Sequence, residues 1–186
     1  SPEERGFADA IRRIIACNPF LPERIAAERE ALGNQFHESA ADWNKRPPTA
    51  KPTANHAALT RRCGELVDRA RAAWPRDGRV DREDLMRYEA MVASWLYETY
   101  AERFDHVILA ALRGEGGEKV DFFPAFRADA EARFGLPGLP ERNADTGHLF
   151  ASAFQIRRAF HNIFQSIVGG STPMARLRAA VWQSAF

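Results

Sequence analysis

Apolar side chains recur three and four residues apart along almost the whole chain, and the alternation typical of a strand is nearly absent. Prolines and glycines interrupt this pattern where they end or cap helices. The spacing predicts helical segments at about residues 4–17, 22–32, 55–74, 82–112, 122–134, 146–168 and 173–184. We therefore expect an all-α fold, a helical bundle of about six to seven helices.

The two longest segments are expected to form the centre of this bundle. Asp81, with Asp84 three residues later, resembles a capping box at the start of a continuous 82–112 helix about 48 Å long. The 146–168 segment carries apolar side chains at intervals of four and three residues, and further phenylalanines widen this stripe. It is therefore expected to be nearly surrounded by other helices.

One stretch departs from the helical pattern. Residues 44–53 hold three prolines, and proline both fixes φ and removes a backbone donor. A proline-rich, extended connector is predicted there. The length otherwise fits a single domain over residues 1–186.

Composition excludes several classes of protein. Hydrophobic residues make up 45% of the chain, which argues against disorder along its length. The 26 basic and 25 acidic side chains leave a net charge of +1, which gives no support for direct contact with nucleic acid. No apolar run approaches the ~18 residues of a membrane helix, and signal-peptide features are missing. Cys17 and Cys63 suit free thiols, so a cytoplasmic location is expected.

Two sets of side chains could bind a small molecule. Trp95 and Tyr100 belong to an aromatic group that could line a pocket between helices, although ordinary core packing would use the same residues. Arg157, Arg158 and His161 lie on the polar side of the most apolar helix. The arginines could receive an anionic ligand, or they could pair with carboxylates of a neighbouring helix.

A metal-binding bundle is the alternative that the acidic residues suggest. Glu98, Glu102 and His106, with Asp105 beside them, fall on successive turns of one predicted helix. Di-metal bundles need a Glu-x-x-His pair on each of two helices, whereas the spacing here is four and occurs once. The same side chains would serve as a solvated, salt-bridged surface. The sequence contains no nucleophile elbow or triad motif, so neither enzyme activity nor a cofactor or metal is predicted.

The C-terminal segment differs from the rest in charge. Residues 145–186 hold one acid, Asp145, and four arginines. The last predicted helix is amphipathic and ends on apolar residues, where chain termini usually carry polar, dispensable ones. We therefore expect the chain to be part of a longer polypeptide; the alternative is a terminal helix that docks on its own domain.

A resemblance to a known family lies mainly in this segment. It is carried by HLFASAFQIRRAFHNIF at 148–164, IVGGS at 167–171 and ARLRAAVWQS at 175–184. These runs resemble the region ahead of the ATPase domain in one group of bacterial sigma-54-dependent transcriptional activators. NPFLPER at 18–24 also resembles the start of those proteins.

The resemblance implies a regulatory role. Proteins of this group combine an N-terminal regulatory domain, a central AAA+ ATPase that remodels sigma-54 RNA polymerase, and a C-terminal helix-turn-helix. The sequence has no phosphate-binding motif and no DNA-binding helix pair, so those functions are placed on none of its residues. The chain would be a non-enzymatic, signal-sensing domain that controls an ATPase of the same polypeptide. Residues 171–186 would be its C-terminal output helix, which leads toward that further domain and offers an interface through Leu177, Val181, Trp182 and Phe186. The resemblance also implies a homo-oligomer, most simply a dimer. A small-molecule or protein signal would be received by a pocket in the bundle or by residues 44–53.

Overall fold

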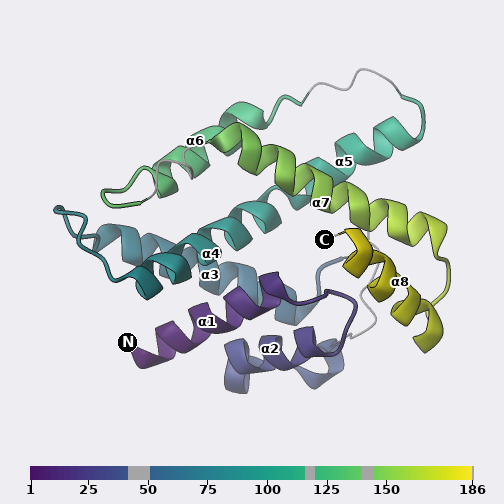
Figure 1. The fold of residues 1–186 in the computed structure, drawn as a ribbon, viewed down its shortest axis with the longest axis horizontal. Helices are drawn as coiled ribbons and strands as arrows, with labels where there is room; N and C mark the ends of the chain where they lie inside the picture. Colours follow the sequence, from purple (N-terminus) through teal and green to yellow (C-terminus); the bar gives the residue numbers. More distant parts are fainter. Residues whose placement is uncertain (42–50, 116–119, 140–144, 186) are drawn as a thin grey trace.

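The chain is all-α, as its hydrophobic periodicity predicts (Figure 1). The computed structural model describes residues 1–41, 51–115, 120–139 and 145–185, and these contain no strand. Their α-helices are α1 (Pro2–Ala16), α2 (Glu23–Leu32), α3 (Ala54–Ala72), α4 (Arg82–Thr99), α5 (Ala101–Leu112), α6 (Phe123–Phe134), α7 (Thr146–Ser166) and α8 (Thr172–Ala185). Two 3-10 helices, η1 (Gly33–Gln35) and η2 (Glu38–Ala40), follow α2. Most of the predicted connector, residues 44–50, lies outside the described residues.

The predicted continuous helix over 82–112 is wrong at one point, because the chain forms two helices that meet at Tyr100. The periodicity misses this break because Leu96 and Phe104, on either side of it, are buried in the same core. Tyr100 is fixed by tertiary contacts: its hydroxyl donates to Asp129 Oδ2 at 2.7 Å, and its ring packs on two phenylalanines at the start of α6. Packing against α6 thus overrides the local preference, and the described residues form eight helices.

The main hydrophobic core lies between helices α1 to α6. Its most deeply buried side chains come from helices far apart in the sequence, namely Ile11, Val67, Leu96, Phe104 and Phe126. Figure 1 shows α7 running lengthwise beside α5 and α6, where it covers this core. The prediction that α7 is nearly surrounded is wrong, because one face of it is open to solvent. That face carries Ala151, Gln155, Arg158, Asn162 and Gln165.

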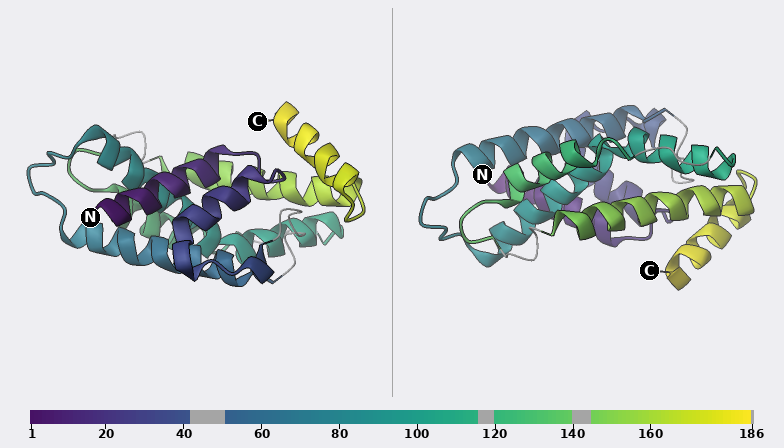
Figure 2. Two further views of the ribbon diagram at one scale, coloured as in Figure 1. Left: turned by 90° about the horizontal axis from the view of Figure 1, so that it is seen from below. Right: turned by 90° about the horizontal axis from the view of Figure 1, so that it is seen from above.

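A second, smaller core lies at the C-terminal end of α7, where α8 folds back (Figure 2). Phe20, from the turn between α1 and α2, is fully buried there among the rings of Phe160, Phe164 and Trp182. In the described part of the chain, this core shares no residue with the main core. α8 is therefore attached through a contact of its own.

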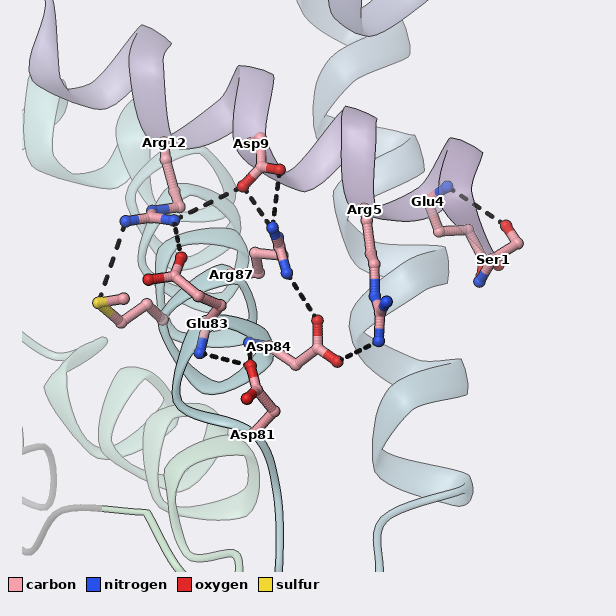
Figure 3. Close-up of polar contacts among 10 residues, drawn as sticks. Ser1, Glu4, Arg5, Asp9, Arg12, Asp81, Glu83, Asp84 and Arg87 are labelled. Carbon is pink, nitrogen blue, oxygen red and sulfur yellow. Dashed lines mark hydrogen bonds and ion pairs between the residues drawn. The ribbon is translucent and has the colours of Figure 1, made fainter.

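Ion pairs join α1 to α4 along an edge of the bundle (Figure 3). Arg87 donates through Nε and Nη2 to the two carboxylate oxygens of Asp9, at 2.9 and 3.0 Å. It also donates through Nη1 to Asp84 at 2.8 Å. The hydrogen bond from Arg87 holds the pKa of Asp9 below its ordinary value of 3.8. This bidentate geometry makes the Arg87–Asp9 pair the strongest contact of the edge.

Replacing Asp9 with asparagine is expected to destabilise the protein by about 0.5–1 kcal/mol, a small value because solvent screens a carboxylate that is 39% exposed. The loss should shrink in about 1 M salt, which screens exposed charges. Urea unfolding measures both effects. Glu131→Gln is the matched control, because Glu131 pairs with Arg127 on an open helix face, and it should change stability little. Equal losses in the two variants would contradict the assignment.

Candidate functional site

The predicted ligand-binding residues fall into separate places in the fold. Trp95 and Tyr100 contact α6, whereas Arg157 and His161 contact α5. Arg158 lies on the exposed face of α7. The fold therefore brings together only Arg157 and His161.

These two side chains meet on a buried carboxylate and form a charge cluster (Asp105, Arg157 and His161). Arg157 donates through Nε and Nη2 to the two oxygens of Asp105, both at 2.6 Å. His161 Nε2 lies 2.8 Å from Asp105 Oδ1. The side chains of Arg157, Asp105 and His161 are 12%, 10% and 4% exposed, so water is largely excluded. The cluster therefore joins α5 to α7 by a buried ion pair, whose partners depend on each other.

The charge states of the cluster follow from these contacts. Burial raises the pKa of Asp105, but the hydrogen bonds and the charges of Arg157 and His161 together lower it by more, so that it lies below 3.8. Burial lowers the pKa of Arg157, but its contacts with Asp105 and Tyr97 together outweigh burial and raise it. Asp105 thus occupies the guanidinium donors that an anionic ligand would use. Of the two interpretations open for Arg157, the geometry favours pairing with a neighbouring carboxylate.

Trp95 and Tyr100 are packed between helices. The guanidinium carbon of Arg133 lies 3.7 Å from the centroid of the Trp95 ring, a cation–π contact. Gly64 of α3 approaches the same ring so closely that a Cβ added to it would lie 2.8 Å from Trp95 Nε1. Asp129 accepts hydrogen bonds from both Tyr100 and Arg133. Both aromatic side chains therefore belong to the packing of α3, α4 and α6.

A surface depression of about 660 Å³ lies where α5 meets the start of α6. It is lined by Glu102, Arg103, His106, Val107, Asp121, Phe122 and Ala125. Glu98 lies elsewhere, since its carboxylate is 3.0 Å from His56 Nε2 of α3. Within the described ranges, no group of three or more His, Cys, Asp or Glu side chains is placed to hold a metal ion. Glu98, Glu102 and His106 are therefore not gathered at one point.

α8 is held by contacts that we call the α8 dock, made by Asn18, Phe20, Phe160, Arg178 and Trp182. Asn18 Nδ2 donates to the carbonyl oxygen of Ala179 at 2.8 Å. The Trp182 ring lies 4.6 Å from the Phe160 ring and 6.0 Å from the Phe20 ring, measured between centroids. Arg178 donates to the carbonyl oxygens of Ile167 and Gly169. The dock therefore joins the turn between α1 and α2 to the last helix of the described chain.

The predicted interface residues of the last helix face two ways. Trp182 packs inward on the dock, whereas Leu177 and Val181 are 46% and 39% exposed. Phe186 lies outside the described residues. The apolar surface that α8 presents to solvent is therefore centred on Leu177 and Val181.

Three residues that organise these sites have roles that no spacing pattern predicts. Asn18 and Phe20 lie in the resembling run at 18–24, but nothing in the sequence predicts that either of them contacts α8. The prediction that Asp105 lies on a solvated surface is wrong, because Arg157 and His161 cover it. One signal could have found it: an acid between Phe104 and Ile108, in a strongly apolar helix, indicates a buried ion pair.

The chain was compared with protein-family models, curated proteins and solved structures, and none of them matches it. Among the described helices, none has both the length and the apolar character needed to cross a membrane. Both cysteines, Cys17 and Cys63, are free thiols, and burial raises the pKa of Cys63 to about 12. That thiol stays protonated and is a poor nucleophile.

Proposed function

We propose that the chain is a regulatory, signal-sensing domain of a bacterial sigma-54-dependent transcriptional activator. It controls the assembly or the activity of an AAA+ ATPase in the same polypeptide and carries out no chemistry itself. It works in the cytoplasm as a homodimer. α8 is its output element, and the depression on α5 receives the signal.

One observation carries this proposal: the two segments that resemble those activators contact each other. Asn18 and Phe20 belong to the N-terminal resembling run, whereas Ala179 and Trp182 belong to the C-terminal one. The hydrogen bond from Asn18 to Ala179 spans 161 positions of sequence, and the Phe20 ring meets the Trp182 ring nearby. The features shared with the family thus coincide with one structural unit, the α8 dock, which supports a common role for that unit.

The position of α8 suits an output element. It leaves α7 at one end of the molecule (Figure 2) and packs on a core separate from the main bundle. Leu177 and Val181 face outward, where a neighbouring domain or a second copy could contact them. A signal that binds one arrangement of α8 better than another would shift the balance between them.

The coding frame after Phe186 gives the first test. A G-x-x-x-x-G-K-[ST] motif is expected within about a hundred codons, the size of a linker and the start of an ATPase domain. A stop codon directly after Phe186 would overturn the proposal.

In the full polypeptide, Trp182→Ala is expected to change the rate of ATP hydrolysis by about tenfold or more, because it loosens the restraint on α8. Gln183→Ala is the matched control, since Gln183 is exposed on the same helix and should leave the rate unchanged. A steady-state ATPase assay measures both variants. An unchanged rate in folded, ATP-binding Trp182→Ala protein would show that α8 transmits nothing to the ATPase.

A further inference from the structure

α8 is held by a few buried apolar side chains together with polar contacts. Its buried residues are Ala175, Arg178 and Ala179, and two of these offer only a methyl group. Trp182 adds a half-buried ring against Phe160. Met174 also packs against this second core. Hydrophobic stabilisation scales with the apolar area removed from water, so α8 gains less of it than a helix with several fully buried side chains in the main core does.

Arg178 supplies the principal polar contact. Its Nε and Nη2 donate to the carbonyl oxygen of Ile167 at 3.3 and 2.8 Å, and Nη2 also donates to that of Gly169 at 2.5 Å. These carbonyls lie at the C-terminal end of α7, where the helix itself provides no further donors. The guanidinium carbon also lies 4.6 Å from the centroid of the Phe164 ring. α8 thus closes the end of α7 with one of its own side chains.

The other side of α8 is held by Asn18, and the turn that connects α7 to α8 is exposed and contains a glycine. The Asn18 amide donates to Ala179 and accepts from the Phe20 N–H at 3.1 Å, so it bridges α8 to the α1–α2 turn. In the turn between α7 and α8, Val168 is 77% exposed, and Gly169 has a φ of +115°, which residues with a side chain rarely adopt. When α8 detaches, water would form hydrogen bonds with the guanidinium, amide and carbonyl groups that it leaves. The free energy lost with these hydrogen bonds is therefore modest.

We infer that α8 forms a latch that swings open about the turn before it while the main bundle stays folded, and that Arg178, which binds carbonyl oxygens of Ile167 and Gly169 at the base of that turn, holds it closed. Segments with few buried apolar contacts open locally at lower free energy than the whole protein unfolds. The inference goes beyond the proposed function, because it concerns motion within this chain alone.

Hydrogen exchange on the 186-residue chain tests the latch. At low urea, α8 amides such as that of Trp182 are expected to exchange at least about 100-fold faster than α4 amides such as that of Val92, with little dependence on urea. Arg178→Ala should speed α8 exchange by about tenfold or more and leave α4 exchange unchanged. Arg176→Ala removes the same charge from an exposed position of α8 and should change neither rate.

Two results would overturn the inference. One is α8 exchange with the same rate and urea dependence as α4; the other is an equal effect of Arg176→Ala and Arg178→Ala. If Arg178→Ala does not fold, Asn18→Ala loosens the latch from the α1–α2 side and should speed α8 exchange alone. An open latch without any ATPase response would count against the proposed function and leave the latch standing.

Discussion

Replacing Asp105 with alanine is expected to destabilise the protein by about 3–5 kcal/mol, because it leaves Arg157 and His161 buried without this carboxylate. Arg157 loses two short hydrogen bonds at once, in a place that water hardly reaches. Native domains are stable by only about 5–15 kcal/mol, so the variant should lie close to unfolding. Urea unfolding at neutral pH, followed by far-ultraviolet circular dichroism, measures the loss.

Two further variants show whether the buried charge is responsible. Glu102→Ala removes an exposed carboxylate from the same helix and should change stability by less than about 0.5 kcal/mol. Asp105→Asn keeps the shape and an acceptor oxygen but removes the charge, so its loss should lie between the other two. If Asp105→Ala were as stable as Glu102→Ala, the charge cluster would not be what joins α5 to α7.

The same cluster makes the protein sensitive to acid. The pKa of Asp105 in the folded protein lies below its ordinary value of 3.8. A carboxyl with a depressed pKa contributes stability that is present above the ordinary value and is lost as the pH falls through the folded-state value. The natural protein should therefore lose stability below about pH 4, and Asp105→Asn should lose less over that interval. Parallel stability curves for the two proteins below this pH would rule out the assignment.

The helices could be predicted because their causes are local. Asp81 and Asp145 cap α4 and α7 by accepting backbone hydrogen bonds two or three residues ahead, and apolar spacing extends each helix from there. The break at Tyr100 has a distant cause, since the partner of its hydroxyl, Asp129, is 29 positions further along the chain. Periodicity contains no information on such a contact, so two helices with a shared apolar face are predicted as one.

The same distinction separates the predicted site residues from the missed ones. Arg157 and His161 are one turn apart, so helix geometry alone places them on one face. Asp105, which completes the cluster, is 52 positions from Arg157, and no spacing rule connects them. Phe20 and Trp182 are further apart still. Only the family resemblance grouped their two segments, and it did so without predicting that they touch.

Replacing Gly138 with alanine is expected to destabilise the protein by about 2–5 kcal/mol. Two effects add: the strain of a left-handed backbone conformation and a steric clash of the new Cβ. Gly138 has a φ of +83°, and a Cβ added to it would lie 2.2 Å from the carbonyl oxygen of Gly78. That oxygen belongs to the backbone and cannot rotate aside. The turn after α3 and the turn after α6 therefore meet backbone to backbone, and Trp74 Nε1 adds a hydrogen bond to the carbonyl of Pro137 at 2.9 Å.

Gly114→Ala is the matched control for this clash. Gly114 has a φ of +74° but no atom within 4 Å of an added Cβ, so it should lose only the conformational part, about 1–2 kcal/mol. The difference between the two variants in their free energy of unfolding, measured with urea, gives the cost of the clash alone. Equal losses of stability in the two variants would show that the two turns can separate without cost. The contact between the turns matters because α4 begins just after the Gly78 turn and α6 ends just before the Gly138 turn. Tyr100, at the opposite end of α4, contacts Asp129 of α6. The two contacts together hold α6 against both ends of α4.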